Sequence, residues 1–198
     1  MKISQIKIKR AFDFVISILL LIVFFPVFFI VAIGIKVDGG PVFFLQDRIG
    51  EKGTTFRIIK FRTMVENAEN LGEGLIVRNE SDIRITAIGK VLRKTSLDEL
   101  PQLINIIMGD MSIVGPRPPV TYHPYKGYEN YPDWAKKRFE VKPGITGLAQ
   151  VKVRNSATWS TRMKIDKQYV EKFSIWLDLK ILILTIRAMF YKETYTGE

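Results

Sequence analysis

The chain has 198 residues, of which 47% are hydrophobic, and its 30 Lys and Arg outnumber 20 Asp and Glu to give a net charge of +10. It has no cysteine and one histidine, which excludes disulfide frameworks, zinc–thiolate sites, thiol nucleophiles and any site that needs two imidazoles. The apolar fraction excludes a disordered chain. The positive charge predicts an anionic partner: a phosphorylated small molecule, a lipid headgroup or nucleic acid.

The first predicted element is an uncharged apolar run from Phe14 to Ile35. A helix of this length reaches about 33 Å, enough to cross the hydrocarbon core of a bilayer. The run is too long for a signal peptide, and no small-residue cleavage site follows it. On hydropathy alone, it is typical of a single transmembrane span.

Two features favour a helix that enters and leaves the bilayer by one face. Pro26 lies near the middle of the run and removes a backbone donor, so we expect the helix to break at Phe25-Pro26. Basic residues flank both ends of the run, and basic flanks prefer the cytoplasmic side. We therefore predict a re-entrant membrane helix, with Asp13 pairing with Lys9 or Arg10 on one helical face.

The predicted fold is α/β and rich in helix. It consists of the re-entrant helix over residues 1–36 and a small mixed α/β domain over residues 37–198. In chain order we predict a strand at 42–45, a second strand at 55–61, a solvated loop at 66–80, a helical or mixed segment at 83–93, an apolar helix at 102–108 that stops at Gly109, a short basic helix at 135–140 and a turn at 141–147.

The last predicted element is a very apolar helix that begins near Ile175. Asp178, Lys180 and Arg187 interrupt it, so it is too charged to span a membrane. Two interpretations remain open: a core helix of the domain, or an amphipathic helix that lies in the membrane interface with its Trp and basic residues at headgroup level.

The adjacent acids Asp98 and Glu99 are the most informative pair in the sequence. One interpretation is structural, because Ser96 and Glu99 have the spacing of a capping box at a helix start. The other is catalytic, because a carboxylate can attack phosphorus. Such an attack requires cations that neutralise the phosphate charge, and a pair of carboxylates together with substrate phosphates suits Mg²⁺.

Four basic residues stand in turn-rich contexts: Lys60, Arg62, Arg93 and Arg117. Each one alone is typical of a solvated surface cation. Prolines on both sides of Arg117 restrict the backbone, however, and favour a guanidinium held ready for bidentate phosphate contact. The only histidine, His123, is expected in a loop and not in catalysis.

Ordered motifs over nearly the whole chain resemble the bacterial sugar transferases, which are small monotopic phosphoglycosyl transferases. The most specific is Arg93-Lys94-Thr95-Ser96-Leu97-Asp98-Glu99-Leu100-Pro101-Gln102, followed after residues 103–108 by Gly109-Asp110-Met111-Ser112-Ile113-Val114-Gly115-Pro116-Arg117-Pro118. Others are Lys60-Phe61-Arg62-Thr63-Met64, the segment Pro143-Gly144-Ile145-Thr146-Gly147, and Asp166 with Tyr169-Val170.

The resemblance implies an enzyme that moves a sugar-1-phosphate from a UDP-sugar to undecaprenyl phosphate and releases UMP, as the first membrane step of a bacterial glycoconjugate pathway such as exopolysaccharide synthesis. It implies a covalent phosphosugar on Asp98, with Glu99 binding Mg²⁺ beside it. It also implies phosphate contacts or supporting roles for Lys60, Arg62, Arg93, Arg117 and Asp166. The implied location is the cytoplasmic face of the bacterial inner membrane, with interfacial helices on its inner leaflet.

Two positions depart from the family pattern. Phe25-Pro26 replaces the usual Ser-Pro at the helix break, and Lys152-Val153 replaces a frequent Asn-Gly before Arg154-Asn155. The chain is expected to be a minimal catalytic unit. A non-catalytic, membrane-anchored basic domain that binds anionic lipid or nucleic acid is the alternative, although aromatic-basic motifs for nucleic-acid recognition are absent from the sequence.

Overall fold

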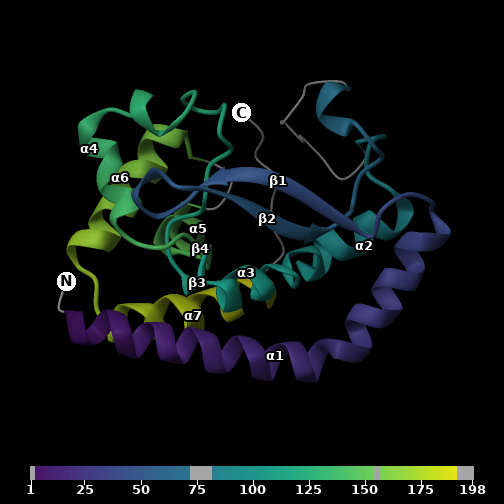
Figure 1. Cartoon of the computed structure of the whole chain (residues 1–198), viewed down its shortest axis with the longest axis horizontal. Helices are drawn as coiled ribbons and strands as arrows, with labels where there is room; N and C mark the ends of the chain where they lie inside the picture. Colours follow the sequence, from purple (N-terminus) through teal and green to yellow (C-terminus); the bar gives the residue numbers. More distant parts are fainter. Residues whose placement is uncertain (1–2, 72–81, 154–156, 191–198) are drawn as a thin grey trace.

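The structure is a computed structural model that describes residues 3–71, 82–153 and 157–190. The described part is rich in helix, with a long N-terminal helix and two small sheets (Figure 1). The helices are α1 (Ile3–Val37), α2 (Ala87–Thr95), α3 (Gln102–Met108), α4 (Asp133–Lys136), α5 (Leu148–Val153), α6 (Trp159–Glu171) and α7 (Ile175–Phe190), and the strands are β1 (Phe43–Ile49), β2 (Thr55–Phe61), β3 (Ser112–Val114) and β4 (Gly144–Thr146).

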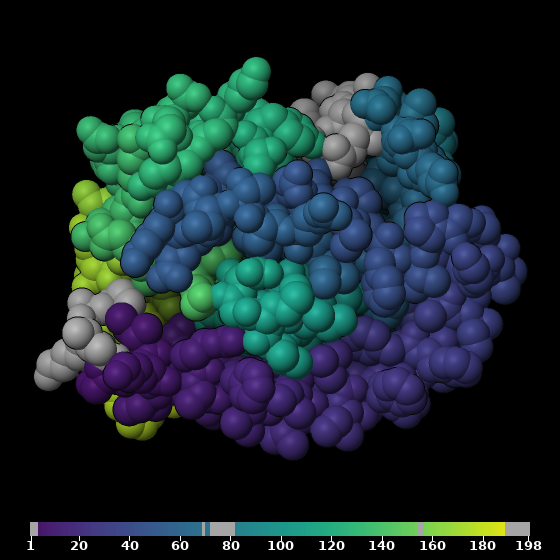
Figure 2. Space-filling model, viewed as in Figure 1, coloured from purple at the N-terminus to yellow at the C-terminus, as the bar shows by residue number. Residues whose placement is uncertain are grey.

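Helix α1 lies along the edge of the molecule and is mostly exposed (Figure 2). It is long and apolar enough to cross a membrane, and only 11% of its most apolar stretch is buried in the protein. Helical geometry continues through Pro26, and Figure 1 shows α1 bending between two arms. A proline inside a helix removes one hydrogen bond and crowds the preceding turn, which accounts for a bend.

The hairpin β1–β2 and helix α3 form the layer above α1 (Figure 1). The strands are antiparallel, with Phe43 opposite Phe61 and Ile49 opposite Thr55. One face of β2 packs on α3 through Ile58 and Ile106. Leu20 and Leu21 of α1 pack against this cluster and so bring α1 to the same core.

The second sheet pairs β3 with β4 in parallel. This pairing depends on a close approach of two backbones, because a Cβ on Gly144 would lie 2.1 Å from the nitrogen of Gly115. Only glycine fits at such a contact. The segment expected to be a turn at 141–147 therefore contains a strand, and that prediction was wrong.

Helix α7 has two different faces. Ile181 is fully buried in a core cluster with Tyr169 of α6, whereas Trp176 is 81% exposed and Ile183 and Ile186 are exposed as well. The core interpretation of this segment thus holds for one face. The other face presents apolar side chains outside the core of the protein.

Several predicted elements are confirmed. The strand at 55–61 and the helix at 102–108 have the predicted bounds, and Gly109 ends the helix with a φ of 96°. The first strand is longer than predicted, and in the segment at 83–93 a turn and a β-bridge at Ile85 precede α2. The basic segment at 135–140 forms α4 and a following 3-10 turn. In the predicted loop at 66–80, residues 68–70 form a 3-10 turn, and residues 72–80 lie outside the described residues, as do Arg154 and Asn155.

Candidate active site

The two acids lie on a 3-10 turn, Leu97–Glu99, between α2 and α3. Helix α2 ends where Ser96 takes a left-handed conformation with a φ of 57°, and α3 begins after Pro101. The Ser96 side chain makes no capping hydrogen bond. The capping box is therefore not formed, and the Glu99 carboxylate has other partners.

Glu99 is held by two cations from distant parts of the chain. Its Oε1 lies 2.6 Å from Lys60 Nζ and 3.2 Å from both Nη1 and Nη2 of Arg117. Burial acts to raise the pKa of Glu99, but the charges of Lys60 and Arg117 outweigh it and hold this pKa at about 2. Glu99 is therefore ionised at any physiological pH.

Asp98 is half-buried and differs from its neighbour. Among the described residues, none donates a hydrogen bond to its carboxylate. Burial raises the pKa of Asp98, and the charge of Lys60 opposes that rise. A carboxylate that is poorly hydrated and bound to no partner is a better nucleophile than one held by two cations. The two acids thus have environments suited to different roles.

Lys60 reaches Glu99 from the end of β2, and the turn with the acids is fixed against that strand by Asn105 of α3. Asn105 is fully buried; its Oδ1 accepts from Ile59 N at 2.9 Å and its Nδ2 donates to Arg57 O at 2.7 Å. Burial lowers the pKa of Lys60, and its pairing with Glu99 opposes this. The contacts of Asn105 with the β2 backbone hold α3, and the acidic turn before it, in a fixed position relative to Lys60.

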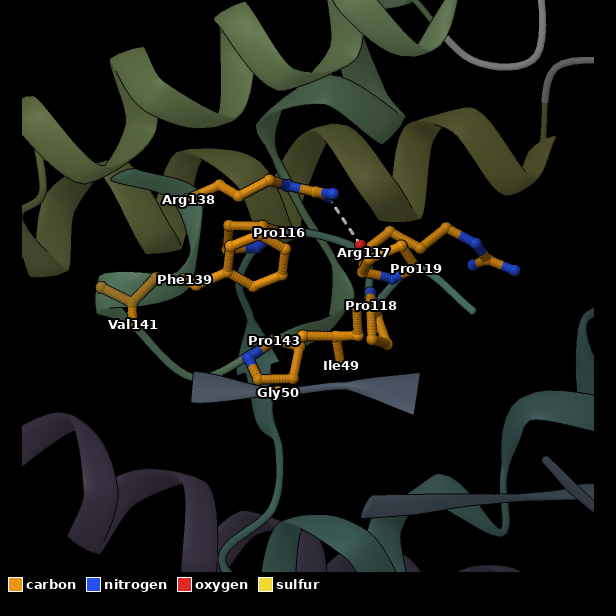
Figure 3. Close-up of a pocket in the computed structure, with 10 residues that line it drawn as sticks. All are labelled: Ile49, Gly50, Pro116, Arg117, Pro118, Pro119, Arg138, Phe139, Val141 and Pro143. Atoms are coloured by element: carbon orange, nitrogen blue, oxygen red, sulfur yellow. Dashed lines mark hydrogen bonds between the residues drawn. The ribbon is translucent and has the colours of Figure 1, made fainter. Parts of the chain in front are cut away.

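Arg117 reaches the site from the loop 115–119. Glu99 raises the pKa of Arg117 and so keeps it charged. Figure 3 shows the residues around this loop, where a hollow of ≈ 170 Å³ is lined by prolines and by Arg138. The Arg117 side chain extends away from the other residues that are drawn (Figure 3).

The other predicted phosphate-binding residues have structural partners. Arg93 donates to Thr63 Oγ1 at 3.0 Å, and its charge acts to lower the pKa of Asp98, so it belongs to the surroundings of the acids. This contact is possible because Gly89 lets α2 approach the Thr63 carbonyl, which would lie 2.0 Å from a Cβ there. Arg62 instead donates to the carbonyl oxygens of Ile35 and Gly39, where α1 ends.

Asp166 is buried away from the acids and pairs with Arg138, at 2.8 Å between Oδ2 and Nη2. Burial raises the pKa of Asp166, and Arg138 opposes this. Asp166 also lines a hollow of ≈ 280 Å³ together with Arg117, Trp159 and Arg162. It is therefore linked to the site through Arg117 and does not contact Asp98 or Glu99.

The predicted pairing of Asp13 with Lys9 or Arg10 was wrong. Asp13 accepts hydrogen bonds from Ser112 Oγ at 2.7 Å and from Ile113 N at 3.2 Å, so it faces β3. Lys9 pairs with Asp178 of α7 at 2.6 Å, and Arg10 donates to carbonyls at the end of α3. All three side chains thus make polar contacts with the rest of the domain. Phe25 and Pro26, in contrast, are exposed.

The residues of the acidic turn fit Mg²⁺ only together with a substrate. Among the described residues there is no group of three or more Asp, Glu, His or Cys that could hold a metal. The hydrogen bonds that the described residues donate to the Glu99 carboxylate end on Oε1, which leaves Oε2 and the Asp98 carboxylate as oxygen ligands. Mg²⁺ commonly uses one or two carboxylates and completes its shell with substrate phosphates and water.

Sequence reasoning missed Arg138, Arg162 and Asn105. Arg138 follows two lysines in a run that looks solvated, yet it is 2% exposed. Arg162 lies over the Trp159 ring, 5.8 Å from its centroid. The spacing of Asn105 within an apolar helix was the only signal available for it, since a polar residue on the buried face of such a helix needs partners.

A family model described as bacterial sugar transferase matches residues 4–192, nearly the whole chain. The chain belongs to the bacterial sugar transferase family. It is 42% identical to the galactosyl transferase CpsE of Streptococcus agalactiae over 95% of the chain, but it spans only 43% of that relative's length. It is 43% identical to the exopolysaccharide production protein ExoY of Sinorhizobium fredii, over 91% of the chain and 84% of the relative.

A third relative of this sugar transferase, from Caulobacter vibrioides, is named UDP-glucose:undecaprenyl-phosphate glucose-1-phosphate transferase. The two are 38% identical over 91% of the chain and 69% of the relative. The acids, Lys60 and Arg117 all lie within the part that matches the family. The site assembled around Glu99 is accordingly the candidate active site of a sugar transferase.

Proposed function

We propose that this sugar transferase moves a sugar-1-phosphate from a UDP-sugar to undecaprenyl phosphate and releases UMP. The observation that carries the proposal is the contrast between its two acids: Glu99 is held by Lys60 and Arg117, while Asp98 beside it accepts no hydrogen bond from the described residues. The name of the Caulobacter relative, which specifies the same donor class and acceptor, supports it. The donor sugar is left open.

In the proposed first step, an Asp98 oxygen attacks the sugar-bearing phosphorus of the donor. A bond forms between Asp98 and that phosphorus, the bond to the bridging oxygen breaks, and UMP leaves with the electron pair. In the second step, a phosphate oxygen of undecaprenyl phosphate attacks the same phosphorus. Asp98 leaves as a free carboxylate, and the product is the undecaprenyl diphosphosugar.

The cations around the acids make these steps feasible. Two anions about 4 Å apart repel by about 1 kcal/mol in water and more strongly where water is scarce. Lys60 and Arg117 offset that repulsion and keep Glu99 ionised. Mg²⁺, held by Glu99 and Asp98, would neutralise the diphosphate and make its phosphorus more electrophilic. Arg93 adds a further positive charge near Asp98.

The membrane elements fit a substrate that stays in the bilayer. Undecaprenyl phosphate is held there by about 0.8 kcal/mol per buried CH₂, and the nucleotide sugar stays in water. We propose that α1 is re-entrant with Pro26 at its bend, and that the exposed apolar face of α7 lies in the interface of the inner leaflet. This would place the acids at headgroup level on the cytoplasmic face, where both substrates can reach Asp98.

The test uses the full chain in lipid nanodiscs that contain undecaprenyl phosphate, with a panel of UDP-sugars. We expect UMP release that requires the acceptor for turnover and stops when EDTA removes Mg²⁺. With a donor labelled in the sugar-bearing phosphate and no acceptor, the label should remain on the protein. The substitution Asp98→Asn should abolish both signals, whereas Asp47→Asn, an exposed acid of β1, should leave them intact.

Two outcomes would contradict the proposal. Normal turnover by Asp98→Asn would show that another group carries the chemistry. Absence of UMP release with every donor, together with binding to anionic vesicles, would favour the non-catalytic basic domain instead.

A further inference from the structure

The loop that presents Arg117 is fastened at every carbonyl from Pro116 to Pro119. Three of its four residues are prolines and have no N–H to donate. The backbone of this loop is therefore held mainly by hydrogen bonds that its carbonyls accept. Their donors are Gly144 N to Pro116 O at 3.0 Å, Arg138 Nη2 to Arg117 O at 2.7 Å, Arg48 Nη1 to Pro118 O at 3.0 Å, and Ile49 N to Pro119 O at 3.0 Å.

Arg138 is the donor that acts at Arg117 itself (Figure 3). Its side chain is 1% exposed and its partner Asp166 is 3% exposed. Taking such a pair out of water costs several kcal/mol per ion, and replacing it by apolar residues is often neutral or stabilising. The pair is therefore weak as a source of stability, and its geometry points to another use.

We infer that Arg138 is a positioning residue for the transfer reaction, which rests on the function proposed above. Asp166 holds the Arg138 guanidinium, and this guanidinium holds the Arg117 carbonyl. Arg117 in turn directs its own guanidinium to Glu99. These contacts thus fix the position of the Arg117 guanidinium, which faces the acids. They begin at a buried ion pair between α6 and the 3-10 turn at 137–140.

A lysine cannot replace Arg138 in this role. Nη2 of Arg138 contacts both Asp166 Oδ2 and Arg117 O, and the guanidinium carbon lies 5.3 Å from the ring centroid of Phe139 and 5.8 Å from that of Trp159. An ammonium group keeps the charge but is not planar, so it cannot lie against both rings while it holds the two acceptors. Arg138→Lys therefore keeps the positive charge at residue 138 but removes the contact geometry that positions Arg117.

The test is a double-mutant cycle in kcat/KM for the UDP-sugar. Arg138→Lys should lower kcat/KM by about tenfold, the scale of one hydrogen bond to a charged group. If Arg138 acts through Arg117, the double variant Arg138→Lys/Arg117→Ala should be no worse than Arg117→Ala alone.

Arg84→Lys is the matched control. Arg84 is also a buried arginine that pairs with an aspartate, Asp82, and donates to loop carbonyls, those of Ala68 and Leu71, but it contacts neither acid of the site. We expect this variant to lower the melting temperature like Arg138→Lys while kcat/KM changes by less than about twofold.

A readout that does not depend on turnover completes the experiment. The only amide between residues 116 and 119 belongs to Arg117, and Arg138→Lys should speed its hydrogen exchange while Arg84→Lys does not. Multiplicative effects of the two site variants, or unchanged exchange at Arg117, would overturn the positioning role. An inactive wild type would overturn the proposed function instead, and the exchange result would still decide the role of Arg138.

Discussion

Nζ of Lys60 lies 2.6 Å from Oε1 of Glu99, and this contact separates the chemistry of two adjacent acids. Lys60 donates a hydrogen bond to Glu99, whereas it acts on Asp98 through charge alone. Glu99 consequently stays ionised, with its pKa at about 2 after burial is outweighed by Lys60 and Arg117. Asp98 keeps a raised pKa because burial prevails there.

The pH dependence of the reaction should report this difference. A protonated carboxyl is no nucleophile, so kcat/KM should fall as the pH drops through the pKa of Asp98, above the ordinary aspartate value of 3.8. Lys60→Met removes a charge that lowers this pKa, so the acidic limb should move to higher pH. Loss of the cation should also reduce kcat/KM at neutral pH by about 100-fold.

The control for this profile is Lys167→Met, which removes a half-exposed lysine that pairs with Glu171 on α6. Its acidic limb and neutral rate should match those of the wild type. A limb that moves to lower pH in Lys60→Met would contradict the assignment of that limb to Asp98.

Local patterns predicted the acids and the elements next to them, because each depends on neighbours in sequence. Alternation defines the strand at 55–61, and an apolar run with a terminal glycine defines the helix at 102–108. The partners of the acids come from far away: Lys60 is 39 residues from Glu99. Sequence motifs named Lys60 and Arg117, but only the fold shows that both end on one oxygen.

The wrong predictions have a related physical cause, since they concern residues whose partners lie far away in sequence. Strands β3 and β4 have three residues each, too few for a periodic signal, and they exist because each supplies the other's hydrogen bonds. The spacing predicts a partner for Asp13 one turn away on its own helix, but the buried Asp13 accepts a hydrogen bond from Ser112 instead. Charges that point to the domain cannot be told from charges that point to solvent by spacing alone.

Asn105 should be essential for holding the acidic turn in place. Asn105→Ala leaves the Ile59 amide and the Arg57 carbonyl without their partner, at a cost of about 2–5 kcal/mol in the free energy of unfolding. The melting temperature should fall by about 5–15 °C, and kcat/KM should fall with it because the turn loses its register on β2. Differential scanning fluorimetry and UMP release measure the two effects.

The exposed Asn130 provides the comparison for this substitution, since its side chain donates to the nearby Lys126 carbonyl. Asn130→Ala should shift the melting temperature by no more than about 2 °C. Equal losses of stability in both variants would show that the clamp between α3 and β2 is unimportant.

Arg62 should act in the fold and not on phosphate. Its contacts with the Ile35 and Gly39 carbonyls close the end of α1. Arg62→Gln removes charged hydrogen bonds to these carbonyls, so the melting temperature should fall by about 3–9 °C while KM for the UDP-sugar changes by less than about twofold. A tenfold rise in KM with unchanged stability would show that Arg62 binds the donor after all.

The re-entrant path of α1 can be tested directly, because the chain has no cysteine of its own. Lys7→Cys and Asp38→Cys place single thiols at exposed positions on either side of the apolar run. In sealed inside-out vesicles, both should react with a membrane-impermeant maleimide as fast as the reference Glu129→Cys in the domain. A thiol at position 7 that stays protected until the vesicles are opened would mean that α1 crosses the bilayer. In that case Lys9 could not reach Asp178 on the cytoplasmic side, so the 2.6 Å contact between them makes the same-side result the expected one.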